Sequence, residues 1–367
     1  MNLNNKGFAI SGILYPLFIL FLVLILGVIG TLSASKAVLD SNKSDVEKKL
    51  NMGRIDYVDV LIVGGGGSGA STMDEQKGGG GGAGGLVFMP NYQVPVYSTV
   101  SIYVGAGGSA IPDSQETGNP SSPGENGENS FFGSLVAIGG GGGRRSNAEA
   151  TFAGVGGSGG GGHLNTPGGE ALQRISMTGG FGNPGGSNDG DAGAGGGGAG
   201  TTGMGDLTST KDGRIQLGAY AGGQGLYEVL VEGNVYNFND MFGTTNMGHF
   251  IEDEVWFSGG GGGGIDASGH ESYGAGGYGG GGRGAYTSEG TSTSDWEIGS
   301  PKGEDAMPNT GGGGGGSRGG ESGAGGSGVV IVRYKGDPKA IGGEVYTNGG
   351  YTIHVFSEIG GHIFRLI

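Results

Sequence analysis

Glycines with the spacing G-x-G-x-x-G are the first residues in this chain that could do chemistry. Gly64, Gly66 and Gly69 follow an apolar segment, and their spacing is the dinucleotide fingerprint of flavin and nicotinamide enzymes. Such a site needs a helix that starts at the glycines, so that its N-terminus faces the pyrophosphate. The next residues, 71–85, are too short and too rich in glycine for that helix, and LVFMP (86–90) lacks the acidic residue for the ribose. A dinucleotide-binding enzyme is therefore the least favoured function.

Other side chains with catalytic or metal-binding potential are few and scattered. The five histidines show no ligand spacing such as H-E-x-x-H, and the chain has no cysteine. Asp189 and Asp191 have the D-x-D spacing of some calcium loops, but a turn rich in Asn, Asp and Gly explains the same residues. No acid pair or serine elbow stands out. The sequence thus predicts no enzyme, no metal site and no cofactor.

Aromatic and acidic side chains gather in two glycine-poor insertions, residues 206–257 and 285–308. Aromatic side chains with a polar group are common anchors of recognition surfaces, and a carboxylate beside a ring can accept hydrogen bonds from sugar hydroxyls. The candidate ligand-binding residues are Trp256, Trp296, Tyr286, Asp295 and Glu297. The alternative is that LYEVLV (226–231) and VYNF (235–238) form a hairpin whose aromatic rings pack on the rest of the protein.

Runs of glycine must position these insertions. Glycine accounts for 97 of the 367 residues. A collagen-like structure is excluded because there is no Gly-X-Y register, and a flexible linker would rarely contain strand-like segments such as STVSIYV (98–104) and GVVIVRY (328–334). Eight runs have four or more consecutive glycines: 64–67, 78–82, 139–143, 159–162, 195–198, 259–264, 279–282 and 311–316.

Ordered glycine runs need a particular kind of packing. Glycine loses more backbone entropy on folding than any other residue and has no side chain to bury, so backbone hydrogen bonds and close backbone contacts must hold it. One solution is an extended left-handed helix with three residues per turn, like polyproline II. Without side chains, such helices can pack against several parallel or antiparallel neighbours and bond to them.

Four segments resemble a known module in wording and in order: DVLIVGGGGSGA (59–70), SIYVGAGGSA (101–110), NGENSFFGSLVAIGGGGG (126–143) and GSGVVIVRY (326–334). They resemble the glycine-rich domain of phage tail-tip adhesins and of many bacterial surface proteins. The resemblance implies a mainly-β body over residues 57–336 with packed polyglycine II helices, and recognition by loops at its ends. GGYTIHVFSEIGGHIF (349–364) also resembles a strand pair of such proteins, which predicts a C-terminal β-hairpin segment in 337–367.

The N-terminal residues form an apolar stretch that precedes this body. There is no charge between Lys6 and Lys36, and about 25 apolar residues would span roughly 38 Å as a helix, enough to cross a bilayer. Lys6-Gly7-Phe8 before this stretch resembles a type IV prepilin: a leader at 1–7, a transmembrane or pilin-like helix at 8–34, and a cut after Gly7 that leaves Phe8 first. The resemblance implies a prepilin peptidase-like enzyme and pilus subunits as partners. Gly12 stands where that family usually has glutamate, and an uncleaved single-pass anchor is the alternative.

Helical spacing continues beyond this stretch, and residues 35–56 are predicted to form a stalk helix. The net charge is −15, but residues 1–55 contain 6 Lys/Arg and 3 Asp/Glu, so the rest of the chain carries −18. Such a body repels nucleic acid and anionic lipid headgroups, and neither is expected as its partner.

Together these features predict a helix that anchors a glycine-rich body at the cell surface or on a pilus. The favoured function is an adhesin or a minor or tip pilin-like protein that binds an extracellular glycan or protein. The alternative is a structural envelope or coat protein with no specific ligand, because a glycine body could act as a spacer alone.

Overall fold

The fold consists of two compact units, Met1–Ile55 and Asp56–Ile367. A computed structural model describes residues 6–51, 55–72, 77–113, 122–145, 152–164, 166–173, 180–188, 192–205, 220–265, 274–287, 299–300 and 302–367.

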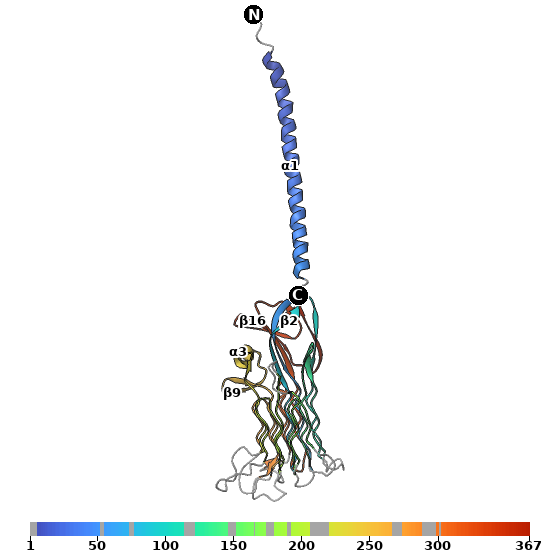
Figure 1. Cartoon of the computed structure of the whole chain (residues 1–367), viewed down its shortest axis with the longest axis vertical. Coiled ribbons are helices and arrows are strands. Elements are labelled where there is room, and N and C mark those ends of the chain that lie inside the picture. Colours follow the sequence, from blue (N-terminus) through green and yellow to red (C-terminus); the bar gives the residue numbers. More distant parts are fainter. Residues whose placement is uncertain are drawn as a thin grey trace. The chain divides into compact units, whose positions relative to one another are not determined.

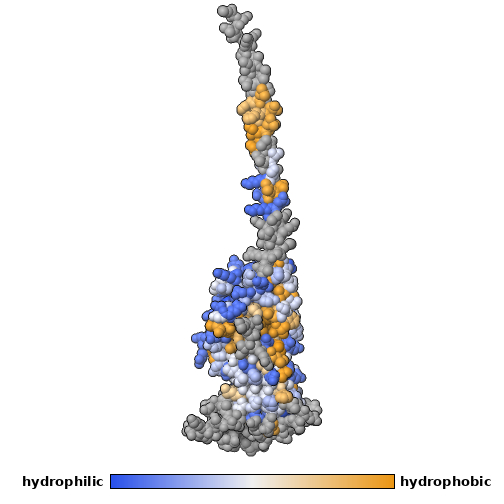
Figure 2. Space-filling view, viewed as in Figure 1, coloured by the Kyte–Doolittle hydropathy of each residue, from blue (hydrophilic) through white to orange (hydrophobic). Residues whose placement is uncertain are grey.

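The first unit is one helix, α1 (Lys6–Asn51), which covers both the predicted membrane segment and most of the predicted stalk. Within it, Leu17–Lys43 is long and apolar enough to cross a membrane. Figure 2 shows hydrophobic side chains along part of this helix and hydrophilic ones further along it. Strand β1 (Ile55–Val63) starts at the last residue of the first unit and includes the last two residues assigned above to the stalk. Gly7 and Phe8 lie at the start of α1.

Two sheets form one end of the second unit (Figure 1). The six-stranded sheet has the order β15 (Glu344–Asn348), β16 (Tyr351–Phe356), β13 (Val329–Lys335), β1, β2 (Leu86–Pro95) and β6 (Gly180–Phe181). The five-stranded sheet has the order β14 (Ala340–Ile341), β17 (Gly360–Leu366), β3 (Thr99–Val104), β4 (Ser130–Phe132) and β5 (Leu135–Ala137). Strands β1 and β13, which are far apart in the sequence, pair antiparallel, with Leu61 opposite Ile331.

Alternation along β1 divides the core into two clusters. Val60 and Ile62 face a cluster that contains Ile102 and Phe364 of the five-stranded sheet. Leu61 faces the second cluster on the opposite side of the six-stranded sheet. Successive side chains of a strand point to opposite faces, so a strand covered on both faces must be apolar throughout. This explains the unbroken run VLIV at the end of β1.

The insertion before Ser258 covers that opposite face. Its elements are β7 (Glu228–Val231), β8 (Asn234–Asn237), α3 (Phe238–Phe242), the 3-10 helix η1 (Gly243–Thr245), β9 (His249–Ile251) and β10 (Glu254–Trp256). The hairpin predicted in 226–238 is present, because β7 and β8 pair antiparallel. Phe238, Phe242 and Phe257 are fully buried against the six-stranded sheet, so these aromatic rings belong to the core.

The glycine segments extend from the sheets and run side by side (Figure 1). Segment 78–85 shows how they are joined, because its N–H groups donate to three neighbours in a repeating order at 2.7–2.9 Å. The pairs are Gly78, Gly81 and Gly84 to the carbonyls of Ser317, Gly314 and Gly311; Gly79, Gly82 and Gly85 to Arg144, Gly141 and Ile138; and Gly80 and Ala83 to Ala194 and Gly197. Every third residue returns to the same neighbour, so the backbone turns once in three residues. The first two neighbours run antiparallel to it and the third runs parallel.

Carbonyls of the same segment accept hydrogen bonds from three further neighbours. Gly79, Gly82 and Gly85 accept from Ala70, Gly67 and Gly64; Gly80 and Ala83 accept from Gly161 and Ser158; and Gly78 and Gly81 accept from Gly264 and Gly261. One segment is therefore bonded to six others. Nearly every buried backbone group must find such a partner, and here different segments of the chain supply it.

Close approach of the segments explains why the residue is glycine. A Cβ added to Gly81 would lie 2.1 Å from the carbonyl oxygen of Gly67, and one added to Gly80 would lie 2.2 Å from that of Gly261. Both distances are shorter than any real contact of a Cβ with backbone. A side chain at such a position must therefore push the neighbouring segment away and break its hydrogen bonds.

Turns interrupt two of the runs that are expected to be extended. Gly279 and Gly280 have φ of 101° and 89° and belong to a turn, so only the later part of run 279–282 is extended. Gly311, with φ of 68°, is the last residue of another turn, so the extended part of run 311–316 begins after it. Positive φ is easy for glycine, so a run of identical residues hides the place where a turn ends.

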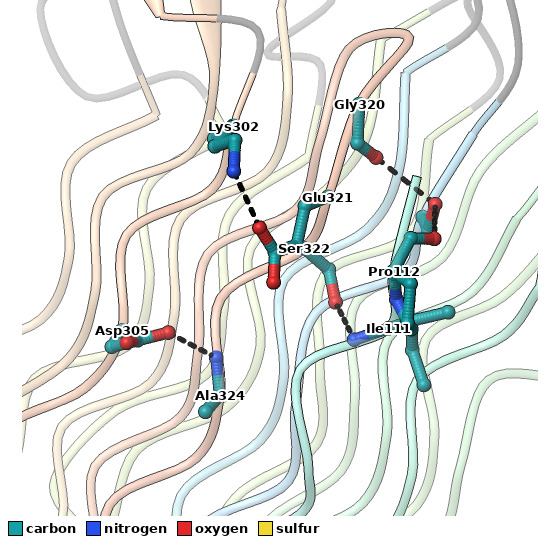
Figure 3. Close-up of polar contacts among 9 residues, drawn as sticks. Ile111, Pro112, Lys302, Asp305, Gly320, Glu321, Ser322 and Ala324 are labelled. Atoms are coloured by element: carbon teal, nitrogen blue, oxygen red, sulfur yellow. Dashed lines mark hydrogen bonds and ion pairs between the residues drawn. The ribbon is translucent and has the colours of Figure 1, made fainter. Parts of the chain in front are cut away.

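Side-chain contacts join glycine segments to their neighbours away from the sheets (Figure 3). The Ser322 hydroxyl accepts from the Ile111 N–H at 2.9 Å, and Asp305 accepts from the Ala324 N–H at 2.7 Å. Lys302 and Glu321 form an exposed ion pair at 2.6 Å. These contacts hold segments 302–307 and 320–327 to each other and to residues 111–112.

The C-terminal residues belong to both sheets. Strands β15 and β16 form a hairpin, and β16 also pairs with β13. This is not the strand pair expected from residues 349–364. The two apolar stretches of 349–364 do not pair with each other, because β17 pairs with β3 of the other sheet. This segment therefore closes the core between the sheets.

We expect Gly141→Val or Gly261→Val to unfold the body or to lower its free energy of unfolding by more than about 4 kcal/mol, well above a typical point change. A Cβ at these positions would lie 2.0 Å from the Gly154 oxygen and 2.1 Å from the Gly314 oxygen, respectively. Urea denaturation of the full chain measures the change. Gly361→Val is the matched control, because nothing lies within 4 Å of its Cβ and it lies in a strand. Equal stability of the Gly141 and control variants would contradict this account of the packing.

Candidate binding groove

A groove of about 360 Å³ lies between hairpin β7–β8 and the end of β10. It is lined by Gly200, Thr201, Gln224, Gly225, Leu226, Tyr227, Glu228, Val229, Leu230, Val235 and Trp256. One predicted ligand-binding residue, Trp256, is thus part of its wall.

Three aromatic rings pack together beside the groove: Tyr227 and Trp256 line it, and Tyr278 contacts Trp256. The Trp256 ring lies 4.6 Å from that of Tyr227 and 5.4 Å from that of Tyr278, measured between centroids. Trp256 is half-buried, and its indole N–H is buried with no hydrogen-bond partner among the residues that the structure describes. The two tyrosines cover much of the indole, so its contribution to binding is mainly apolar surface.

Backbone and side-chain hydrogen bonds fix the floor of the groove. Gln224 donates its N–H to the Thr201 hydroxyl and accepts from the Tyr278 N–H with its side chain, both at 2.8 Å. Its carbonyl accepts from the N–H groups of Gly200 and Thr201. The floor is therefore built from glycine segments that are themselves part of the hydrogen-bonded body.

Apolar side chains stand at the rim. Leu230 and Val235 are opposite each other in the β7–β8 register and are 66% and 63% exposed. Their neighbours Val229 and Val231 point the other way and are only 3% exposed. An exposed apolar cross-strand pair beside an aromatic wall is the kind of surface that binds a partner.

The surroundings of the groove are acidic. Residues 220–258 contain no lysine or arginine but include Glu228, Glu232, Asp240, Glu252, Asp253 and Glu254. The negative charge of Glu228, followed by partial burial and the charge of Glu254, raises the pKa of Tyr227 above its usual range. The tyrosine hydroxyl therefore stays protonated and remains a donor.

Of the other predicted ligand-binding residues, Tyr286 is the one within the described part of the chain, and it does not line the groove. Tyr286 is 36% exposed in the short strand β11 (Tyr286–Thr287), which pairs with β12 (Gly299–Ser300). Trp296, Asp295 and Glu297 lie outside the described residues, as do Asp189 and Asp191. Their roles stay predictions.

Several groove residues were not singled out from the sequence. In the sequence, Leu230 and Val235 look like ordinary strand residues. The residues around them do not indicate that they face solvent while the opposite face of the hairpin is buried. Tyr278 lies between glycines, far along the chain from Trp256. The sequence signal for the hairpin is the Glu232-Gly233 dipeptide between the two strand-like segments. In the structure these residues form a two-residue turn with φ of 50° and 81°, and this turn sets the register.

The fingerprint glycines have a structural role. The N–H groups of Gly64, Gly66 and Gly69 donate to the carbonyls of Gly85, Gly326 and Gly323 at 2.9–3.0 Å. Residues 64–70 are extended, and no helix begins there. These donors are therefore already bonded within the body. Among the described residues, no group of three or more His, Asp or Glu side chains could hold a metal ion.

His354 is the histidine with the most defined surroundings. It is buried, and its Nδ1 lies 2.6 Å from the Gly342 carbonyl, which can only accept, so Nδ1 carries the proton. Nε2 then accepts from the Tyr334 hydroxyl at 3.0 Å, and that hydroxyl accepts the Lys339 N–H at 2.9 Å. Burial lowers the pKa of His354, and burial also lowers the pKa of His249.

Comparison with known proteins places most of the chain in one family. A family model described as a glycine-rich domain matches residues 51–335, well over half of the chain, including the groove. The chain matches no curated protein and no solved structure at a significant level.

We expect the free energy of unfolding to decrease as the pH falls below about 6.5, the ordinary pKa of histidine. In this range the unfolded chain binds protons at His354 and His249 that the folded chain does not, so stability is full above that pH and is lost as the pH falls through the lowered pKa values. Urea denaturation from about pH 8 to pH 5 measures this dependence. His354→Gln should make the slope shallower, and an unchanged slope would show that His354 does not titrate as described.

Proposed function

This chain belongs to the glycine-rich domain family, and we propose that it is a cell-surface protein, membrane-anchored or pilus-associated, that binds an extracellular glycan or protein. The observation that carries the proposal is the groove between β7 and Trp256, with its aromatic wall and its exposed pair Leu230 and Val235. Exposed apolar patches on a folded protein commonly mark interaction sites. A structural coat protein that binds nothing would not need one.

We further propose that the glycine segments are polyglycine II helices packed in a lattice. The return of hydrogen bonds to the same neighbour at every third residue of 78–85 supports this, since such helices have three residues per turn. Six neighbours around one segment fit a lattice of parallel and antiparallel rods. Such a body would be stiff, because its backbone groups are bonded in several directions, and it would hold the groove at a fixed place.

The apolar part of α1 supports attachment to a membrane or to a pilus. Leu17–Lys43 satisfies the length and composition needed to span a bilayer. Lys6-Gly7-Phe8 at the start of α1 supports a prepilin-like processing step, with a cut after Gly7. The glycine-rich unit would then lie outside the cell, with α1 in the membrane or packed among pilus subunits.

Processing is tested by the mass of the N-terminal peptide from native material. We expect mature protein to begin at Phe8 with a methylated amine, and Gly7→Leu to leave the leader attached. Gly12→Ala is the matched control and should be processed normally, since it lies beyond the cut. Mature wild-type protein that begins at Met1 would contradict the prepilin-like step and leave a simple anchor.

Binding is tested with cells that display the full chain, applied to a panel of immobilised glycans and extracellular proteins. We expect Trp256→Ala and Tyr227→Ala to reduce retained cells by about tenfold or more, because a central aromatic anchor contributes about 2 kcal/mol and 1.4 kcal/mol is tenfold. Phe250→Ala is the control, since Phe250 is 46% exposed in the same insertion but does not line the groove.

Melting temperatures separate loss of binding from loss of folding. The two groove variants should melt within a few degrees of the control. If wild-type cells bind nothing in the panel, or if Phe250→Ala reduces retention as much as Trp256→Ala, the groove is not the binding site.

A further inference from the structure

We infer that the groove binds an extended polypeptide strand, which pairs with the free edge of β7 and carries basic side chains. This inference rests on the proposed binding function and specifies the class of its partner. It depends on three features: the backbone groups that the hairpin leaves unpaired, the exposed Leu230 side chain, and the negative charge of the insertion.

The hairpin register fixes the direction of each backbone group. Val231 pairs with Asn234 across the two-residue turn, so these two residues exchange hydrogen bonds, as do Val229 and Tyr236 further along. The Phe238 N–H donates to the Tyr227 carbonyl, which continues the same alternation.

The intervening residues of β7 must therefore point their N–H and C=O groups away from β8. These residues are Glu228 and Leu230, and neither backbone has a hydrogen-bonding partner elsewhere in the described part of the chain. Two such residues present two donors and two acceptors at the two-residue spacing of a strand, roughly 7 Å. An incoming strand can bond to all four groups.

The same edge is already used at the closed end of the groove. Leu226 and Phe257 exchange hydrogen bonds at 3.0 Å in both directions and form an antiparallel bridge. Beyond this bridge the chain from Phe257 turns into β10, which pairs with β9 rather than with β7. The edge of β7 is thus closed at Leu226 and open from Glu228 to Leu230.

Side chains at the open part fit a strand better than a sugar. The exposed Leu230 side chain lies on one face of β7, where a side chain on the same face of a strand added at the β7 edge would pack against it. A sugar ring would instead need an exposed indole face on which to stack. Tyr227 and Tyr278 flank the indole, and its N–H is buried.

The negative charge of the insertion favours strands that carry basic side chains. The insertion has six acidic residues and no lysine or arginine over 220–258, and Glu228 lines the groove itself. Glu228 and Leu230 are two residues apart and therefore lie on the same face of β7. A strand with an apolar residue beside Leu230 and a lysine or arginine two positions along, beside Glu228, would match both side chains. Binding should then weaken as salt is raised.

The chain offers a matched pair of substitutions to test this. Proline lacks an N–H and is tolerated in a strand where that group faces away from the paired strand. Leu230→Pro removes the central donor of the open edge of β7. Val235→Pro makes the equivalent change on β8, where the lost N–H faces the opposite edge of the hairpin, and both variants lose an exposed apolar side chain.

The probe is a phage-displayed library of random short peptides, selected on the full wild-type chain in detergent micelles. We expect enriched peptides to carry an apolar residue and a lysine or arginine two positions apart. Synthetic versions should bind Leu230→Pro at least about tenfold more weakly than wild type and bind Val235→Pro within about twofold of wild type. Methylation of alternate peptide nitrogens should abolish binding on one register and spare the other, which a side-chain contact alone would not do.

Three results would overturn strand addition: no enrichment of peptides, binding that survives Leu230→Pro, or equal loss in both proline variants. The proposed function is judged separately by the adhesion of displaying cells. If adhesion depends on Trp256 but survives Leu230→Pro, the groove binds its target without strand pairing. If adhesion does not depend on Trp256 while peptides bind as expected, the groove is a peptide site that does not mediate adhesion.

Discussion

Hydrogen bonding between backbones that lie too close for any side chain is the constraint on which the structure depends. Segment 78–85 donates to three neighbours and accepts from three others, and a Cβ on Gly80 or Gly81 would collide with a carbonyl oxygen about 2 Å away. Each segment therefore requires glycine in itself and in the segments around it. The entropy lost by ordering so many glycines is offset only if all of these bonds form together, which makes the body cooperative.

This constraint also explains where a binding site can lie. Glycine segments present almost no side chains, so specificity must come from residues inserted between them. The described part of the 206–257 insertion buries Phe238, Phe242 and Phe257 on the six-stranded sheet, and it exposes Leu230 and Val235 on the opposite face of its hairpin. The floor of the groove, around Gln224, belongs to the glycine body. The glycine body thus forms one side of the groove, and the hairpin forms the other.

Much of the framework could be predicted because its signals are local. The apolar segments at 57–63 and 328–334 are β1 and β13, and LYEVLV with VYNF forms the expected hairpin. The apolar stretch FFGSLVAI (131–138) is divided into β4 and β5 by Gly133, which has a φ of 58°. The groove could not be predicted, since it depends on the bridge between Leu226 and Phe257 and on the place of Tyr278, contacts between residues distant in sequence. Trp256 could be singled out because a tryptophan in a glycine-poor insertion is conspicuous, although Phe238, Phe242 and Phe257 of the same insertion belong to the core.

Hydrogen–deuterium exchange of the glycine amides in the full chain tests the central claim most directly. If the segments are held by mutual backbone hydrogen bonds, amides in 78–85, 139–143 and 259–264 should exchange only through global unfolding, with the same free energy and the same dependence on denaturant as the amides of β1 and β13. Exchange within seconds throughout these runs, while β1 and β13 remain protected, would show that the glycine segments are not bonded as described.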